Sequence, residues 1–491
     1  MIAITTPSID WAGLSPYLIT LFGAAVVLLV CVFLPFAARR PFAIGASLLT
    51  LVGAAASSIT LLALDRDPSG MISDTIRRDD LTHFAQVILF VTAIVAVLVS
   101  VRERADKEHV GEFYGLLIVA VSGMAFFTAS NSLMTLFLGL EWFSIALYVL
   151  SAIQTDRVKS LEAGLKYLVV GSFGSAVLLF GLAFVYGATG SLQFTEIAAA
   201  ANENGLLLAA GLAMILVGLA FKVSAAPFHQ WTPDVYEGAP TTVTAFMAAA
   251  TKIAAFVLTL RFLTTAFPDE SELWTITLGV LATISLAWGN LAALAQKNVK
   301  RILAYSSVSH AGFLLMPIAA GNEIGGKALL YYLIPYGAMS LGSFAIVAAR
   351  ERELNREVGV DEMAGLGWER PLHGIAMATF MLGFIGLPPT GLFLGKFYAF
   401  SALYDRGWVW LMVIGAVFTA VSAYYYLGIV RSMYMRASEL VAVPAGGSPP
   451  QDRALTLAIA ASLVIAVGSF FGVDPIVDVI KDAVAFLPYP Y

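Results

Sequence analysis

Apolar runs of about 20 residues, separated by short polar segments, follow one another along almost the whole of this 491-residue chain. A helix of that length crosses the hydrocarbon core of a bilayer. The composition agrees, because 59% of the residues are hydrophobic and only 12% are charged. The short alternating strands of a membrane β-barrel are missing from the pattern. The sequence therefore predicts an all-α polytopic membrane protein with about 14 transmembrane helices.

The predicted spans follow from the apolar runs and the polar residues between them. They cover residues 17–36, 44–64, 81–101, 113–128, 132–153, 161–186, 206–225, 241–264, 274–295, 302–319, 326–349, 374–404, 408–434 and 454–471. The run at 374–404 is long and contains Pro388 and Pro389, so we expect one broken helix there rather than two spans. The N-terminal segment has no basic region ahead of an apolar core, so we expect the first span to be retained rather than cleaved as a signal peptide.

Lysine and arginine residues between the predicted spans are concentrated in one set of alternate loops. This set includes Arg39 and Arg40, Lys300 and Arg301, and Arg350. Short loops rich in lysine and arginine stay on the cytoplasmic side of a membrane. We therefore assign this set to the cytoplasm, which places both termini on the non-cytoplasmic side.

Two lysines stand inside apolar runs in the segment 206–261. Lys222 and Lys252 flank a stretch that contains Pro227, Pro233 and Pro240. A lysine at the centre of a bilayer costs about 3 kcal/mol on the insertion scale. Broken helices are tolerated at that depth where they are buried in protein or line a cavity. The pattern predicts an ion path, and the alternative for each lysine is that it extends its amine to the membrane interface.

Three further charges fall inside predicted spans. Glu141 lies about 15 Å from the start of its span, at 1.5 Å per residue, and Lys396 follows the Pro388-Pro389 break. Burial favours the neutral form of a lysine and a nearby carboxylate favours its charged form, so a lysine between these influences can serve in a proton relay. The alternatives are a packing ion pair for Glu141 and snorkelling for Lys396. Lys166 is near the cytoplasmic end of its span, where snorkelling fits as well as a relay.

Histidines and acidic residues near these lysines add candidates. His310 lies inside a span and His229 follows the Pro227 break. Histidine can relay protons near neutral pH, and the alternative is a hydrogen-bonded packing histidine. Asp234 and Glu237 would collect protons at the mouth of the ion path, and the alternative is that they cap and solvate a loop. His83 is expected to lie at the membrane interface.

Motifs for an energy source or a redox group are missing from the sequence. There is no GxxxxGK[ST] loop, and GATGSLQF and GVDEMAGLG follow no predicted strand. The single cysteine, Cys31, excludes a disulfide framework and a cysteine-based zinc or iron–sulfur site, and no histidine pair has haem spacing. We therefore expect no cofactor or metal in this chain and no nucleic-acid partner. Such a chain either exchanges ions down a gradient or is driven by a partner.

The two expected helix breaks stand five spans apart. One is at Pro227 in the seventh span and the other at Pro388-Pro389 in the twelfth. A five-span unit that is repeated once has opposite topology in its two copies. Broken helices at matching places in two such halves mark the transport site of many membrane transporters.

Four segments resemble the antiporter-like membrane subunits of respiratory complex I. They read LEAGLKYLVVGSFGSAVLLFG, FKVSAAPFHQWTPDVYEGAPTTVTAFMAAATK, NVKRILAYSSVSHAGF and GFIGLPPTGLFLGKFYAF. Within that family the chain is most similar to the subunit N group of NADH–quinone oxidoreductase. Lys396 stands where subunit M is expected to have glutamate, the chain ends soon after the fourteenth span without the lateral helix of subunit L, and WTPDVYEGAP and LPPTGLFLGKFY have the wording of subunit N.

The resemblance implies a fold of two inverted five-helix repeats with a broken seventh and a broken twelfth helix. It divides the chain into residues 1–110 with spans one to three, 111–265 with the first repeat, 266–436 with the second repeat, and 437–491 with the last span and tail.

The resemblance also implies roles for the buried polar residues. Glu141 matches a carboxylate that pairs with the seventh-span lysine, here Lys222. Lys252 matches a connecting lysine, and His310 lies where the central polar axis of the family passes. Lys396 matches the lysine that leads to the exit half-channel.

The activity implied is proton translocation by a membrane-arm subunit, driven by quinone reduction elsewhere in the complex. Other subunits would bind NADH, flavin, iron–sulfur clusters and quinone. The expected partners are the other membrane-arm subunits, especially the neighbouring antiporter-like and small membrane subunits, within a bacterial inner membrane. The alternatives are a subunit of a multi-subunit cation/proton antiporter, a subunit of a related ferredoxin-driven complex, and a structural member that has lost transport.

Overall fold

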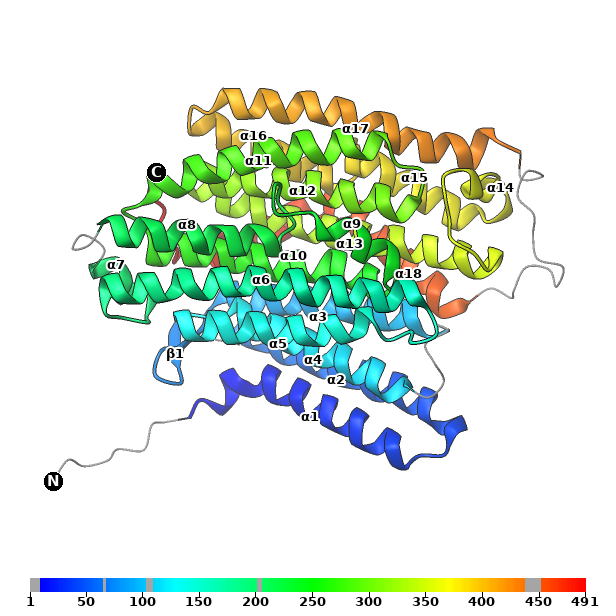
Figure 1. The fold of residues 1–491 in the computed structure, drawn as a ribbon, viewed down its shortest axis with the longest axis horizontal. Helices are drawn as coiled ribbons and strands as arrows, with labels where there is room; N and C mark the ends of the chain where they lie inside the picture. Colours follow the sequence, from blue (N-terminus) through cyan, green and yellow to red (C-terminus); the bar gives the residue numbers. More distant parts are fainter. Residues whose placement is uncertain (1–8, 65–67, 103–108, 201–204, 438–451) are drawn as a thin grey trace.

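A computed structural model describes residues 9–64, 68–102, 109–200, 205–437 and 452–491. In it, long helices lie side by side with their axes roughly parallel (Figure 1). The helices are α1 (Trp11–Phe33), α2 (Phe36–Leu64), α3 (Asp80–Ser100), α4 (Val110–Thr128), α5 (Leu133–Ser151), α6 (Val158–Thr189), α7 (Phe194–Ala200), α8 (Gly205–Lys222), α9 (Trp231–Gly238), α10 (Thr241–Ala266), α11 (Ser271–Leu294), α12 (Val299–Ala320), α13 (Glu323–Leu354), α14 (Leu366–Glu369), α15 (Pro371–Ile385), α16 (Gly391–Asp405), α17 (Val409–Met435), α18 (Arg453–Phe471) and α19 (Val473–Val484). Two short strands, β1 (Ser69–Met71) and β2 (Ile76–Arg78), form an antiparallel hairpin, and a 3₁₀ turn covers Asp361–Met363.

Among the described residues, 13 helices are long and apolar enough to cross a membrane. The remaining expected span is the pair α15 and α16, which the break at Pro388-Pro389 separates into two half-length helices. The expectation of about 14 spans with one broken helix at residues 374–404 is thus confirmed. The chain is a multi-pass membrane protein.

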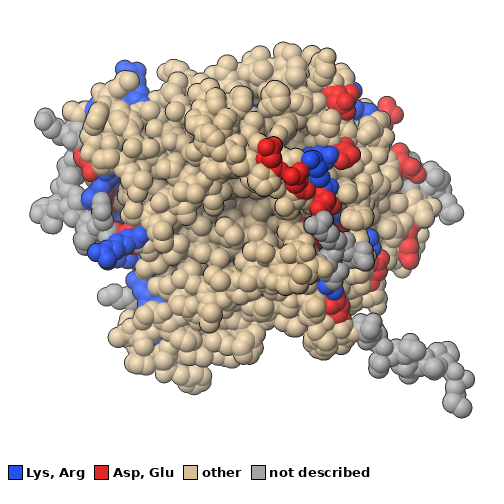
Figure 2. All heavy atoms as spheres, turned by 180° about the vertical axis from the view of Figure 1, so that it is seen from behind, with Lys and Arg blue, Asp and Glu red and all other residues tan. Residues whose placement is uncertain are grey.

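The distribution of charge on the surface fits this topology. Figure 2 shows lysine, arginine, aspartate and glutamate at the two ends of the molecule, with an uncharged belt between them. On that face, basic side chains gather at one end, and acidic side chains predominate at the other. A belt without charge is what the hydrocarbon core of a bilayer requires.

Both expected breaks lie inside the bundle. α8 ends at Lys222, and the chain resumes a helical path at Trp231 in α9. α15 ends at Ile385, and Gly386 has a φ of 94°, which glycine adopts at no steric cost. The seventh and twelfth spans are therefore broken, as the sequence predicts.

Helix α10 forms the centre of the fold. Every residue of α10 except Thr265 is buried, and α3, α4, α12 and α13 pack around it. Close packing elsewhere depends on small residues. A Cβ added to Gly181 of α6 would lie 2.8 Å from the carbonyl oxygen of Gly211 in α8. Without side chains at these positions, α6 and α8 approach closely enough to hold Lys222 against α5.

Several features of the structure were not predicted. The last helix, α19, carries Asp474, Asp478 and Lys481 on one side and buries Ile480 and Val484 on the other, as interfacial helices do. His83, which the sequence suggested for the membrane interface, is buried, and its Nδ1 lies 3.2 Å from Gln86 Oε1. It stands in the first turn of α3, at the end of that span, with its side chain packed inside the protein.

A buried ion pair joins the N-terminal helices to the centre. Asp79 caps α3 by accepting from the Thr82 amide, and its two carboxylate oxygens lie 2.6 and 2.7 Å from the Arg261 guanidinium of α10. Burial alone would raise the pKa of Asp79, but the charge and hydrogen bonds of Arg261 outweigh it and hold that pKa well below its usual range.

Candidate functional site

Lys222, the last residue of α8, points into the bundle. It is buried, and its Nζ donates a hydrogen bond of 2.6 Å to Ser144 Oγ of α5. The same Nζ lies 4.5 Å from the centroid of the Phe143 ring, within the range of a cation–π interaction. The hydroxyl and the ring give the ammonium group two electron-rich neighbours without a formal charge.

Glu141 lies on the same helix as Ser144, three residues earlier and so on the same face. Its Oε1 is buried and has no hydrogen-bond partner in the described structure. Its charge acts on Lys222, although no ion pair within 4.0 Å joins the two among the described residues. Ser144 is the direct partner of Lys222 and was not among the residues predicted from the sequence. Its position one helical turn from Glu141 is the sequence feature that could have indicated it.

Lys252 of α10 is held by the break in the seventh span. It is buried, and its Nζ donates to the carbonyl oxygen of Val223 at 2.7 Å. A helix leaves its last carbonyls without intrahelical partners. Because α8 stops at Lys222, the Val223 carbonyl is free to accept from the lysine of a neighbouring helix.

Lys396 of α16 repeats this arrangement at the second break. Its Nζ donates to the carbonyl oxygens of Phe384 and Ile385 at 2.9 and 3.0 Å, at the end of α15. It also lies 4.1 Å from the centroid of the Phe313 ring. Gly386 contributes here, since a Cβ at that residue would lie 2.9 Å from Lys396 Cδ.

His310 of α12 is buried next to the second break, where its ring lies 5.0 Å from that of Phe384, centroid to centroid. Its Nδ1 is 2.8 Å from the Tyr332 hydroxyl and its Nε2 is 3.2 Å from the Tyr426 hydroxyl, with roles that depend on the tautomer. The charges of Lys252 and Lys396 both act on it. The direct partners of the imidazole are thus two tyrosine hydroxyls. The two tyrosines were not predicted, because they come from α13 and α17.

The three buried lysines share one electrostatic property. Within the described ranges, no carboxylate lies within 4.0 Å of the Nζ atom of Lys222, Lys252 or Lys396. Their partners are hydroxyl and carbonyl oxygens, which accept a hydrogen bond from a neutral amine as well as from an ammonium group. Each site can therefore hold its lysine in either protonation state, which a structural ion pair could not do.

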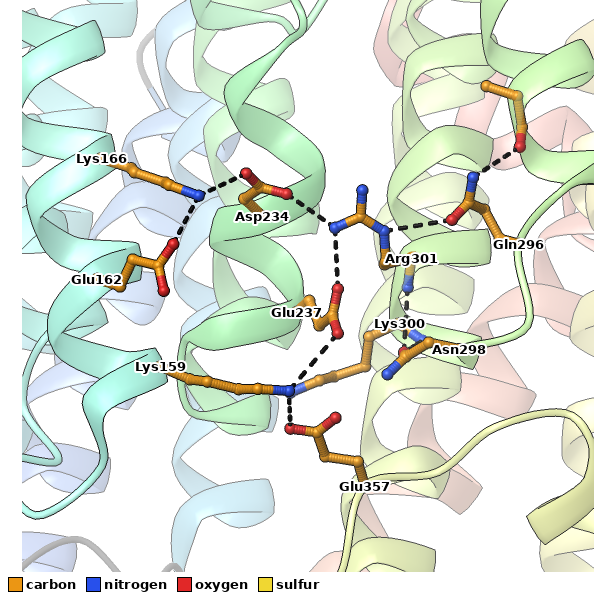
Figure 3. Close-up of polar contacts among 11 residues, drawn as sticks. Lys159, Glu162, Lys166, Asp234, Glu237, Gln296, Asn298, Lys300, Arg301 and Glu357 are labelled. Carbon is orange, nitrogen blue, oxygen red and sulfur yellow. Dashed lines mark hydrogen bonds and ion pairs between the residues drawn. The ribbon is translucent and has the colours of Figure 1, made fainter.

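Charged residues form a network at the basic end of the bundle. Figure 3 shows Asp234 of α9 between Lys166 of α6 and Arg301 of α12, at 2.8 Å from each, and Arg301 also bonds Glu237 at 2.9 Å. Lys166 further pairs with Glu162 at 2.7 Å, so its amine ends in an ion-pair network. The network ties α9, which follows the first break, to the helix that carries His310.

The position of His229 differs from that of His310. It is buried next to the rings of Trp288 and Tyr305, at centroid distances of 5.7 and 6.3 Å. In the part of the chain that the structure describes, no hydrogen bond joins it to Lys222, Lys252 or Lys396. A packing role among aromatic rings fits this environment.

The network makes a testable contribution to acid stability. Burial raises the pKa of Asp234, but hydrogen bonds from Lys166 and Arg301 more than offset it, so the pKa lies below its ordinary value. A carboxyl group with a lowered pKa stabilises the fold at pH values above about 4 and loses this contribution as the pH falls further. We expect Asp234→Asn to lower the thermal unfolding temperature slightly at pH 7, because Asp234 is partly exposed. At the most acidic pH at which the protein unfolds reversibly, the difference should be smaller, and a difference that grows with acid would contradict this account.

Comparisons with known proteins match this geometry. The family model described as "NADH:quinone oxidoreductase/Mrp antiporter, TM" matches residues 130–422, which include Glu141, Lys222, Lys252, His310 and Lys396. NADH-quinone oxidoreductase subunit N of Trichlorobacter lovleyi is 39% identical over 452 residues, which cover 91% of this chain and 92% of that protein. The chain belongs to the NADH-quinone oxidoreductase subunit N family. The family that the sequence motifs suggested is thus confirmed.

Chains of known structure have a fold similar to that of this chain. A chain of respiratory complex I from Thermus thermophilus, solved with bound aureothin, is similar with a TM-score of 0.80 and 33% identity, covering 94% of this chain and 98% of that one. A chain of the Mrp complex from Dietzia sp. has a TM-score of 0.83 at 20% identity, covering 97% and 98%, which is a likeness of fold. In the described ranges, no group of three or more His, Cys, Asp or Glu residues is placed to hold a metal ion.

Proposed function

We propose that this chain translocates protons as a membrane-arm subunit of NADH–quinone oxidoreductase. The observation that carries the proposal is the repeated pairing of a helix break with a buried lysine, Val223 with Lys252 and Phe384–Ile385 with Lys396. In the order that we propose, Lys222 comes first, and His310, on which the charges of Lys252 and Lys396 both act, stands between these two lysines. Groups that can exchange protons thus follow one another through the apolar interior, and Glu141, Lys222, Lys252, His310 and Lys396 are the proposed relay.

The mechanism that we propose is electrostatic. While the Glu141 carboxylate is charged, it favours the ammonium form of Lys222. At an effective dielectric constant of about 20, moving two unit charges from 8 to 4 Å changes their interaction by about 2 kcal/mol. That is close to the roughly 2.3 kcal/mol that one charge gains from 100 mV of membrane potential. A small displacement or neutralisation of Glu141 is therefore enough to make Lys222 release its proton toward Lys252, from which His310 and Lys396 carry charge onward.

The remaining parts of the proposal concern the surroundings of the chain. Residues 111–265 and 266–436 would form the two inverted repeats, with residues 1–110 and 437–491 packed around them. The basic end would face the cytoplasm of a bacterium, with both termini outside its inner membrane. Flavin, iron–sulfur clusters and quinone would bind to partner subunits, and the neighbouring antiporter-like and small membrane subunits would contact this chain.

Purification with an affinity tag on this chain, followed by reconstitution into liposomes, tests the function. We expect flavin- and iron–sulfur-bearing subunits to co-purify, and NADH with a quinone to generate a pH gradient that an uncoupler collapses. The second candidate, a cation/proton antiporter, is favoured by the Mrp-like fold. It predicts a pH gradient driven by Na⁺ or K⁺ without an electron donor, and that result together with no redox subunits would overturn the proposal.

A further inference from the structure

A polar cavity opens at the basic end of the bundle, away from the proposed relay. Its volume is about 370 Å³. Its walls come from the turn after α5, the start of α10 and the end of α13, and they include Gln154, Arg157, Thr241, Glu351 and Asn355. A cavity of this size and polarity has room for several water molecules. It therefore brings the aqueous phase to the first turn of α10, the helix that carries Lys252.

A buried lysine that the relay does not use lies behind the wall of this cavity, in contact with Thr241 and Glu351, which line it. Lys300, in the first turn of α12 beside Arg301 (Figure 3), is 1% exposed. Its Nζ donates to Thr241 Oγ1 at 3.2 Å and lies 3.5 Å from Glu351 Oε1. The Thr241 hydroxyl in turn donates to the other carboxylate oxygen of Glu351 at 2.5 Å. Glu351 is 20% exposed and lines the cavity, so the carboxylate meets water while the lysine does not.

Hydroxyl groups continue from this pair into the protein. Ser307 follows Lys300 by seven residues of α12, so it lies on the same face and about 10 Å deeper. The Tyr336 hydroxyl donates to Ser307 Oγ at 3.3 Å. The ring of Tyr336 lies 5.2 Å from that of His310, centroid to centroid. Transfer across the interval of about 10 Å between Lys300 and Ser307 would require a few hydrogen-bonded water molecules, which the inference below includes.

We propose that Glu351 and Lys300 form the site at which this chain takes up protons from the aqueous phase at its basic end and passes them toward His310. The inference rests on the proposed function, since it supplies an entry to that relay. The site lies where α10 of the first proposed repeat meets α12 and α13 of the second.

The proton balance of the step is simple. A hydronium ion in the cavity protonates the Glu351 carboxylate, and an O–H bond forms as water is released. Lys300 then has no charged partner within 4.0 Å in the described structure, and burial disfavours an unpaired ammonium. Lys300 releases its proton toward the hydroxyl groups of Ser307 and Tyr336. The Thr241 hydroxyl rotates, accepts the proton of Glu351 and gives its own to the neutral amine, which restores the starting state.

Other charges around Glu351 set the background of this titration. They are Lys300 of α12, Asp156 and Arg157 after α5, and Arg352, Arg356 and Glu357 at and after the end of α13. Lys159 neutralises Glu357 at 2.6 Å, and Arg356 lies 3.6 Å from Glu362. Lys300 is therefore the cation that contacts Glu351 directly.

The test uses the whole complex in liposomes, with the ratio of protons pumped to electrons transferred as its readout. We expect Glu351→Gln to lower this ratio about 10-fold at pH 8 and less at pH 6, because a site without its base depends on the bulk proton concentration. Glu351→Asp should retain most of the ratio and carries the test if the glutamine variant fails to assemble. Glu323→Gln is the matched control, since it removes an exposed carboxylate of α13 that pairs with Lys327 and does not line this cavity, and it should behave as the wild type.

The outcomes separate this inference from the proposed function. A wild-type ratio for Glu351→Gln from pH 6 to pH 8, in a preparation where Lys222→Ala abolishes pumping, would overturn the inference and leave the function standing. An equal loss at every pH, together with failure of Glu351→Asp to restore the ratio, would also overturn it and assign Glu351 a structural role. Normal pumping by Lys222→Ala would overturn the proposed function instead.

Discussion

Replacement of Lys222 with alanine is expected to abolish proton pumping, or to reduce it at least 10-fold, while the complex still assembles. The change removes the group on which the Glu141 charge acts and leaves the Ser144 hydroxyl without its donor. No other lysine of the described structure contacts Ser144. The measurement is the ratio of protons pumped to electrons transferred in reconstituted liposomes.

Two further variants make this result specific. Lys222→Arg keeps a positive charge but cannot release a proton, because a guanidinium stays protonated. It should therefore fail to pump, whereas a purely structural charge would tolerate it. Lys327→Ala removes a lysine that pairs with Glu323 on the surface of α13 and should pump normally. A normal ratio in Lys222→Ala would show that the seventh-span lysine carries no proton.

The sequence located the buried charges but not their partners. A lysine in an apolar run is conspicuous because of its energetic cost, so Lys222, Lys252 and Lys396 could be recognised individually. Ser144 could not, because serine is common in membrane helices and its bond to Lys222 joins residues 78 apart in the chain. The carbonyl acceptors at both breaks are backbone groups, which no residue pattern marks; they follow only from where α8 and α15 end.

The same distinction applies to the fold. Apolar run lengths predict the spans, and the two prolines at 388 and 389 predict the twelfth-span break. The short amphipathic helix α19 was missed because a run of 12 residues is too short to register as a span. The Glu351–Lys300 pair was also missed, since Lys300 looked like an ordinary cytoplasmic loop residue. Its burial depends on the way α10 and α13 close around the first turn of α12.

Arg261→Met is expected to destabilise the protein by about 3–5 kcal/mol at pH 7, the largest effect on stability that we predict. The variant removes three hydrogen bonds, two to the Asp79 carboxylate and one to Thr82 Oγ1, and leaves a buried carboxylate without its cation. Asp79 also caps α3, so the start of a central helix is affected. Thermal unfolding of the solubilised complex, followed by tryptophan fluorescence, measures the change.

The pH dependence of this variant identifies the cause. In the wild type, Arg261 holds the pKa of Asp79 far below its ordinary value despite burial, so the stabilising contribution is present above about pH 4. Without Arg261, burial raises the pKa of Asp79, and the variant loses stability as the pH rises through the ordinary value. The difference in unfolding free energy between wild type and Arg261→Met should therefore be largest at pH 7 and should decrease toward pH 4.

Asp79→Asn combined with Arg261→Met removes both charges and should recover part of the lost stability at pH 7, since an amide needs no counter-charge. A gap that is independent of pH, with no recovery in the double variant, would assign the effect to packing around α10 rather than to the ion pair.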